Sequence, residues 1–223
     1  MVNFKRITLF AGHYGSGKTN IAVNYAVLLK NKGFNVKIAD LDIVNPYFRT
    51  KDSAELLNKE GIEVISPSFA NTNVDLPALP AEAYSLVQNK NIYAVLDIGG
   101  DDRGAYALGR YRPYILEENN YEMVFVANFY RPLTTTPQSA LEVMREIEEA
   151  SQIKFTAIVN NSNLGNQTTP EDIVASDIKA KELEKLTGLP LIFTAVRADI
   201  ADSVNLENIV PLVLQQKYFD IKE

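Results

Sequence analysis

The fold of this chain is decided by one stretch, Gly12-His13-Tyr14-Gly15-Ser16-Gly17-Lys18-Thr19, which has the pattern G-x-x-x-x-G-K-T. The run before it, residues 7–11, is short, mostly apolar and partly β-branched, as is typical of a buried parallel strand. The run after it, residues 20–30, places apolar side chains at helical spacing. The sequence therefore predicts a strand, a glycine-rich loop and a helix in immediate succession.

A loop of this kind binds phosphate because its successive backbone N–H groups point at one anion and the helix N-terminus adds partial positive charge. Lys18 can reach the β- and γ-phosphates, and the Thr19 hydroxyl is placed to bind Mg²⁺. A glycine-rich turn that only caps a helix is the alternative. We expect the nucleotide to be bound by Gly12, His13, Tyr14, Gly15, Ser16, Gly17, Lys18, Thr19 and Asn20.

The composition excludes several other classes of protein. The chain has 223 residues, of which 46% are hydrophobic, and a net charge of −6, which argues against a surface built for nucleic acid or anionic lipid. The absence of cysteine excludes disulfides and thiolate metal sites, and the single histidine, His13, excludes a multi-histidine metal site. No apolar run is long enough to span a membrane, and residues 1–6 lead straight into the first strand without a signal peptide. We therefore expect a cytoplasmic protein with no integral membrane association.

Strand patterns alternate with helical patterns along the whole chain. This alternation predicts an α/β fold with a doubly wound, mostly parallel sheet of about seven strands and helices on both faces. Thr136-Pro137 and Thr169-Pro170 each predict an N-cap followed by proline at the first helical position. With no repeat or linker in the sequence, we expect one P-loop nucleotide-binding domain over residues 1–223. The expected strands are 6–11, 35–40, 62–65, 92–97, 121–127, 154–160 and 190–195, and the expected helices lie near 18–31, 52–60, 80–90, 103–117, 137–151, 170–187 and 204–218.

Carboxylates follow two of the expected strands. Asp40 and Asp42 lie two residues apart, so they can share one face and look toward the phosphates. Asp97 is followed after two residues by Gly100. This pattern predicts a carboxylate on the metal side of the site, followed by a loop in which the N–H of Gly100 senses the γ-phosphate. An aspartate that only turns the chain after a strand is the alternative for each. Taken with the glycine-rich loop, these residues predict nucleotide chemistry.

On these motifs the chain resembles the ParA/MinD/CobQ-type branch of the P-loop NTPases, the nitrogenase-iron-protein-like class, over nearly its whole length. The resemblance implies that Asp42 orients the attacking water, and that Asp40 and Asp97 support Mg²⁺ beside Thr19. It also implies that Asn160 reads adenine, together with backbone at 197–199 after the last strand.

The chain departs from that family at one place. Many members carry a signature lysine early in the loop that reaches a partner's phosphates across a dimer, and His13 occupies the matching position here. Imidazole is shorter and mostly neutral at pH 7, so it does not supply the same charge. An arginine can replace that charge in trans, as arginine fingers do. The candidates near the expected mouth of the site are Arg49, Arg103 and Arg131, each of which can also be a solvated surface residue.

The function expected from these features is that of an ATPase that binds ATP with Mg²⁺, hydrolyses it slowly, and passes a conformational signal to a protein partner or a second copy of the chain. Lys18 and Asp42 carry the catalytic roles, and Thr19, Asp40 and Asp97 the metal roles. The absence of an N-K-x-D guanine signature favours ATP. The alternative is a synthetase of the dethiobiotin-synthetase or cobyrinate-amidase type that activates a small carboxylic acid. A third reading is a regulator that binds nucleotide without turnover.

Two further segments carry expectations. Residues 67–80 form the longest irregular stretch, which is either functional or a surface connection stiffened by prolines. Residues 206–221 have apolar residues at helical positions, but Pro211 interrupts the pattern and the charges are mixed. We therefore expect a docking helix there instead of a membrane anchor.

Overall fold

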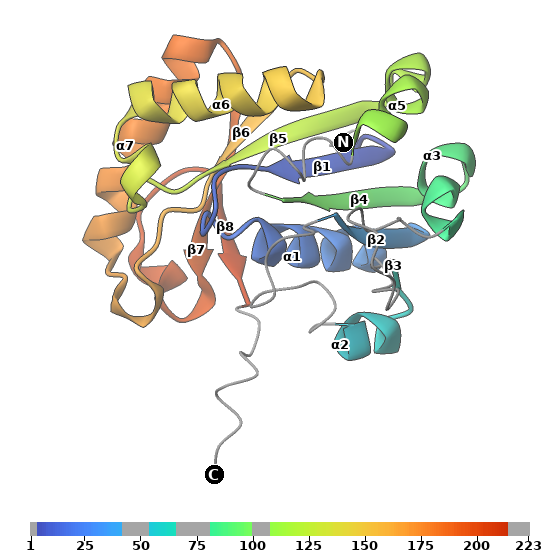
Figure 1. Ribbon diagram of the computed structural model, residues 1–223. Coiled ribbons are helices and arrows are strands. Elements are labelled where there is room, and N and C mark those ends of the chain that lie inside the picture. The colour runs from blue at the N-terminus through green and yellow to red at the C-terminus, as the bar shows by residue number, and fades with distance from the viewer. Residues whose placement is uncertain (1–3, 42–53, 66–80, 100–107, 214–223) are drawn as a thin grey trace, which may run out of the picture.

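The computed structural model describes residues 4–41, 54–65, 81–99 and 108–213, and these residues form one eight-stranded sheet in the order β3-β2-β4-β1-β5-β6-β7-β8 (Figure 1). Every pair of neighbouring strands is parallel. The expected α/β fold with a parallel sheet is therefore confirmed. The strands are β1 (Ile7–Ala11), β2 (Val36–Leu41), β3 (Glu63–Ile65), β4 (Tyr93–Ile98), β5 (Tyr121–Ala127), β6 (Ala157–Asn160), β7 (Leu191–Arg197) and β8 (Ile209–Leu212).

Helices cover both faces of the sheet, as expected. Helices α1 (Lys18–Asn31) and α2 (Ala54–Lys59) pack on one face, where Phe10 of β1 belongs to the same apolar cluster as Ile21 of α1. On the other face, Leu9 of β1 lies in a cluster with residues of α3 (Ser85–Gln88), α5 (Arg112–Glu118), α6 (Pro137–Ser151) and α7 (Pro170–Thr187). Successive residues of β1 thus face opposite layers, as a strand buried on both sides requires. Short 3₁₀ helices complete the described part: η2 (Ala81–Tyr84), η3 (Leu108–Arg110), η4 (Pro132–Thr134), η5 (Gly165–Gln167) and η6 (Ala198–Ser203).

The expectation of a helix over 204–218 is wrong in the part that the structure describes. Residues 209–212 form β8, a parallel strand beside β7, and residues 214–218 lie outside the described residues. Asn208 takes a left-handed backbone conformation, with φ of 58°, immediately before the strand. Pro211 is compatible with an edge strand but would interrupt a helix. The sheet consequently has one strand more than the sequence suggested.

The helix ends expected from proline and threonine are present. Thr136 and Thr169 each accept a hydrogen bond from the backbone N–H three residues later, and proline follows each of them as the first helical residue. At the other end of α7, Gly188 has φ of 71°, the left-handed conformation that favours glycine. The part of the expected 103–117 helix that the structure describes is η3 followed by α5, and 103–107 lie outside the described residues. Within the described ranges, no helix combines the length and the apolarity needed to cross a membrane.

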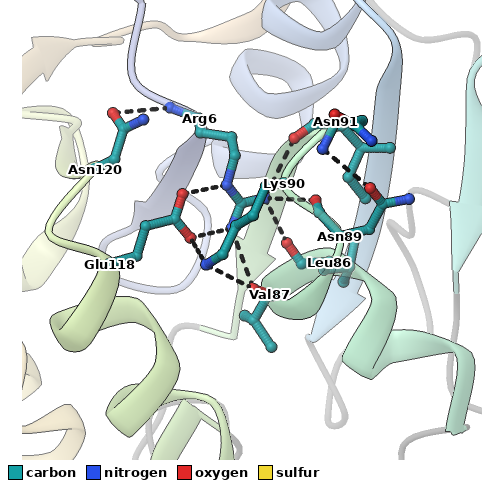
Figure 2. A network of polar contacts seen from close by, with 9 residues as sticks. Arg6, Leu86, Val87, Asn89, Lys90, Asn91, Glu118 and Asn120 are labelled. Carbon is teal, nitrogen blue, oxygen red and sulfur yellow. Dashed lines mark hydrogen bonds and ion pairs between the residues drawn. The ribbon is translucent and has the colours of Figure 1, made fainter.

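The amino-terminal edge of the sheet is held by a buried arginine (Figure 2). Arg6, directly before β1, hydrogen-bonds both carboxylate oxygens of Glu118 at the end of α5, and Lys90 contacts the same carboxylate at 2.6 Å. The Arg6 guanidinium also donates to four backbone carbonyls in α3 and in the segment that leads to β4, those of Leu86, Val87, Asn89 and Ile92, at 2.9–3.3 Å. One side chain thereby joins α3, α5 and the start of β4.

The strand order reverses at β1, and the loop after β1 lies at the opposite, carboxyl-terminal edge. β1 lies between β4 and β5, and the helices that follow β1 and β5 pack on opposite faces of the sheet. The loops after these two strands therefore diverge where the direction of strand progression reverses. Open parallel sheets bind ligands at this position.

Candidate functional site

The loop between β1 and α1 has a backbone that requires glycine. Gly15 and Gly17 have φ of 75° and 84°, in the left-handed region. A Cβ on Gly17 would lie 2.2 Å from Nδ2 of Asn161, and a Cβ on Gly12 would lie 2.5 Å from the Val126 carbonyl oxygen. The close approach of the neighbouring segments therefore leaves no room for side chains at these two positions. The expected succession of strand, loop and helix is confirmed.

The polar side chains of the loop fit an anion. Lys18 is almost fully buried, and its Nζ donates to the carbonyl oxygen of His13 at 3.3 Å, which holds the ammonium across the loop. The hydroxyl of Ser16 is buried without a hydrogen-bond partner among the residues that the structure describes. Buried polar groups normally have partners. An unpaired hydroxyl within a glycine cradle at a helix N-terminus fits a phosphate oxygen.

The expected metal-binding residues come together at the base of the loop. The Thr19 hydroxyl donates to Oδ2 of Asp97 at 2.6 Å. Asp40 is the register partner of Asp97 across β2 and β4, and both carboxylates are buried. A hydroxyl and two carboxylates are oxygen ligands of the kind that Mg²⁺ prefers, either directly or through water. The structure thus brings together Thr19, Asp40 and Asp97, which lie far apart in the sequence.

The remaining loop residues lie at its outer side. Tyr14 is 58% exposed, and Nδ1 of His13 lies 3.0 Å from the carbonyl oxygen of Tyr14. Asn20 is half-buried in the first turn of α1. Asp42 and Gly100, the residues expected to orient water and to sense the γ-phosphate, lie outside the described residues.

Asn160 is buried and already hydrogen-bonded. Its Nδ2 donates to the Ser176 hydroxyl at 2.9 Å, and its Oδ1 accepts from the Ser162 hydroxyl at 2.7 Å and the Ser162 N–H at 3.2 Å. These bonds order the segment after β6 against α7. To read a base, the amide would have to exchange at least one of them, and that role stays a prediction.

Two side chains contact the loop from segments distant in the sequence. Asn161, directly after β6, donates from Nδ2 to the carbonyl oxygen of Ser16 at 2.7 Å. Arg131, after β5, donates from Nε to the carbonyl oxygen of Gly15 at 2.9 Å. The sequence indicated Arg131 only as one of three arginines, and it gave no indication of Asn161. The position of Asn161, one residue after the end of the strand predicted at 154–160, was the only feature of the sequence that could have indicated it.

A cavity of about 500 Å³ opens beyond the ends of β7 and β8 and is lined by Asn166, Arg197, Ala198, Asp199, Leu212 and Val213. Asn24 of α1 exchanges two hydrogen bonds with the Val213 backbone, at 3.0 and 3.2 Å, so the helix that begins at the glycine loop joins the cavity wall. The Arg197 guanidinium donates to Oδ2 of Asp199 at 2.8 Å, and this hydrogen bond lowers the pKa of the Asp199 carboxyl below its usual range. The cavity therefore presents a charged pair at neutral pH.

Comparisons with known proteins define the fold. No family profile matches this chain, and no curated protein sequence matches it. Among solved structures it is similar to the cell division protein FtsY of Thermotoga maritima, with a TM-score of 0.60 and 19% identity over 86% of this chain and 61% of that one. It is similar to FtsY of Mycoplasma mycoides, with a TM-score of 0.57 and 19% identity over 88% of this chain and 63% of that one. It is also similar to chloroplast FtsY of Physcomitrella patens, with a TM-score of 0.60 and 18% identity over 88% of this chain and 60% of that one.

The chain thus spans less than two thirds of the length of these FtsY structures. At such low identity, the likeness establishes the shared α/β fold. The narrower resemblance to the ParA/MinD/CobQ branch stays a prediction.

Proposed function

We propose that this chain is a Mg²⁺-dependent P-loop nucleoside triphosphatase that uses ATP and hydrolyses it slowly, in the manner of ParA/MinD-type proteins. The observation that carries the proposal is the 2.6 Å hydrogen bond between Thr19 and Asp97 at the base of a glycine loop. That loop ends in a buried lysine at the first residue of a helix. The fold shared with FtsY supports the same class.

The roles follow from where charge has to be neutralised. Phosphoryl transfer depends on positioning and electrostatic stabilisation more than on covalent chemistry. The loop N–H groups and the Ser16 hydroxyl bind phosphate oxygens, and Lys18 exchanges its bond with the His13 carbonyl for the phosphates. Mg²⁺, when bound, neutralises charge on the phosphate chain, and Thr19, Asp40 and Asp97 would hold it. Asp42 orients the attacking water, and Gly100 contacts the terminal phosphate.

The nucleoside lies toward the cavity beyond β7 and β8. The walls of this cavity are linked to α1 through Asn24, and the cavity is large enough for a purine. Asn160 contributes to adenine recognition after it releases one of its present bonds. The assignment of ATP over GTP rests on the sequence, so both nucleotides belong in the test.

The outcome of hydrolysis is a change of conformation that a protein partner or a second copy of the chain recognises. Asp97 ends β4, so the strand that carries a metal-side carboxylate leads directly into the expected sensor at Gly100. Loss of the terminal phosphate would release that sensor.

The test is calorimetric titration of the full chain with Mg-ATP and with Mg-GTP, together with steady-state phosphate release. We expect Lys18→Ala to abolish turnover and to weaken nucleotide binding, because no other buried ammonium crosses the described part of the loop. Lys185→Ala is the matched control, since Lys185 is exposed on α7, away from the loop. Wild-type affinity and turnover in Lys18→Ala would refute the assignment. Release of ADP only in the presence of a carboxylic acid would instead favour the synthetase reading.

The metal role has its own test. Thr19→Val keeps the shape of the side chain but removes the hydroxyl, whereas Thr19→Ser keeps the hydroxyl. We expect Thr19→Val to lose the stimulation of nucleotide binding by Mg²⁺ and Thr19→Ser to retain it. Equal Mg²⁺ dependence in the two variants would contradict the proposed ligand.

A further inference from the structure

Arg131 lies against the glycine loop from the segment that follows β5. Its Nε donates to the Gly15 carbonyl oxygen at 2.9 Å, and a Cβ built on Gly15 would lie 3.4–3.7 Å from the Nε, Cδ and Cζ atoms of Arg131. The guanidinium is therefore hydrogen-bonded to the loop, and a side chain at this left-handed glycine would lie at van der Waals distance from it. Its two terminal nitrogens form no hydrogen bond within the residues that the structure describes.

The segment that carries Arg131 is well fixed. The Asn128 carbonyl accepts hydrogen bonds from the Arg131 N–H at 3.2 Å and from the Thr134 hydroxyl at 2.6 Å, which close a tight turn around the arginine. The Phe129 N–H donates to the Ser162 hydroxyl at 2.8 Å, which joins the turn to the segment after β6. The Tyr130 hydroxyl donates to the Asp172 carbonyl at 2.8 Å, which joins it to the first turn of α7. The arginine thus projects from a preorganised support.

The chemistry of guanidinium explains why this placement matters. Arginine has five N–H donors in a planar fork, and the Gly15 carbonyl uses one of them. The terminal pair can bind two oxygens of one phosphate side by side, an arrangement that is stronger than a neutral hydrogen bond. The chain as a whole has a net charge of −6, which repels anions. The positive charge of Arg131 beside the glycine loop would attract a phosphate to the place where it is expected to bind.

We propose that Arg131 contacts the terminal phosphate of the nucleotide from within the same chain and thereby makes the site prefer a triphosphate over a diphosphate. This inference rests on the proposed function, because it requires that the loop binds a nucleotide. A purely structural arginine that only braces the Gly15 carbonyl would affect both nucleotides equally.

The experiment measures dissociation constants of the full chain for a non-hydrolysable triphosphate analogue and for the matching diphosphate, with Mg²⁺, using whichever base the wild type binds. Arg131→Gln removes the charge but keeps a donor for Gly15. We expect it to lower the preference for triphosphate by about tenfold or more, since a hydrogen bond to a charged group is worth that much. Arg131→Lys keeps the charge but not the planar fork of donors, so we expect its preference for triphosphate to fall between those of the wild type and Arg131→Gln. Arg145→Gln, on an exposed position of α6, makes the same charge change and leaves the preference unaltered.

A preference in Arg131→Gln equal to that of the wild type would overturn the inference, even if both nucleotides bound more weakly. Thermal melting checks that this variant folds, and if it does not, Arg131→Lys takes its place, with an unchanged preference as the refuting result. Failure of the wild type to bind any nucleotide would overturn the proposed function and this inference together. Nucleotide binding by the wild type combined with an unchanged preference in the variants would overturn the inference alone.

Discussion

Replacement of Arg6 by methionine would remove the central residue of the network at the amino-terminal edge of the sheet (Figure 2). The side chain of Arg6 is 5% exposed and that of its partner Glu118 is 11% exposed. Methionine matches only the aliphatic stem of arginine, is shorter than the whole side chain, and cannot donate a hydrogen bond. Among the residues that the structure describes, the carboxylate would keep only Lys90, whose side chain is 58% exposed. The backbone carbonyls of Leu86 and Val87 in α3, and of Asn89 and Ile92 before β4, would also lose the bond from Arg6.

The expected cost can be bounded from these contacts. Removal of one partner of a buried ion pair costs about 3–5 kcal/mol, because the other charge stays buried without compensation. The remaining Lys90 contact reduces this cost, whereas each backbone carbonyl left unpaired in a buried position adds about 1–3 kcal/mol unless water reaches it. We expect a net loss of about 4 kcal/mol in the free energy of unfolding. This would be a large fraction of the roughly 5–15 kcal/mol that is typical of a domain.

Urea denaturation followed by circular dichroism measures this loss as a shift of the unfolding midpoint. Lys90→Met is the matched control, because it removes an exposed partner of the same carboxylate, and we expect a loss below about 1 kcal/mol. Nucleotide affinity, measured well below the transition, should not change in either variant, since the network lies at the edge of the sheet opposite to the glycine loop. A loss below about 1 kcal/mol in Arg6→Met would refute the reasoning.

Three further predictions concern the site and the pH dependence of stability. Asn161→Ala leaves the buried Ser16 carbonyl without its donor, so we expect a loss of about 1–3 kcal/mol in urea denaturation and weaker nucleotide binding by calorimetry; unchanged values for both would argue against the contact. Gly17→Ala places a Cβ 2.2 Å from Asn161 Nδ2 at a residue with positive φ, so we expect this variant to lose nucleotide binding. Equilibrium titration measures the affinity, and a retained affinity would contradict the expectation. Burial raises the pKa of Glu118, but hydrogen bonds from Arg6 and Lys90 outweigh this effect and lower the pKa below its usual range. The stability that this network contributes is therefore complete above the usual carboxyl pKa, and it is lost as the pH falls through the lower pKa of the folded state. Urea midpoints of the wild type measured from neutral to acid pH should show this loss, and Arg6→Met should show less of it.

Local signals in the sequence were sufficient for most of the fold. The pattern at residues 12–19 predicted β1, the loop and α1 because glycine, lysine and threonine act there through their immediate neighbours. Threonine followed by proline predicted the starts of α6 and α7 for the same reason. The run at 209–212 was misassigned because a short apolar stretch fits both periodicities, and only packing against β7 decides between them.

The candidate site could be predicted only in part. The proximity of Thr19, Asp40 and Asp97 could be predicted because each follows or ends a recognisable strand or motif, and parallel strands bring those ends together. Asn161 and Arg131 act through contacts with residues 145 and 116 positions away, respectively. Such pairings depend on the order of strands in the sheet, which no local pattern in a single sequence specifies.

The central position of β1 also determines how the nascent chain can fold. This strand leaves the ribosome before the other described strands of the sheet, but its neighbours in the sheet are β4 and β5. Synthesis must therefore reach Ala127 before the first strand can be enclosed on both sides. Long-range pairing of this kind is slow and leaves apolar surface exposed during translation. Until then, the glycine loop lacks the Val126 carbonyl that packs against Gly12, so a nucleotide bound at the proposed site would stabilise only a chain that has already been made through β5.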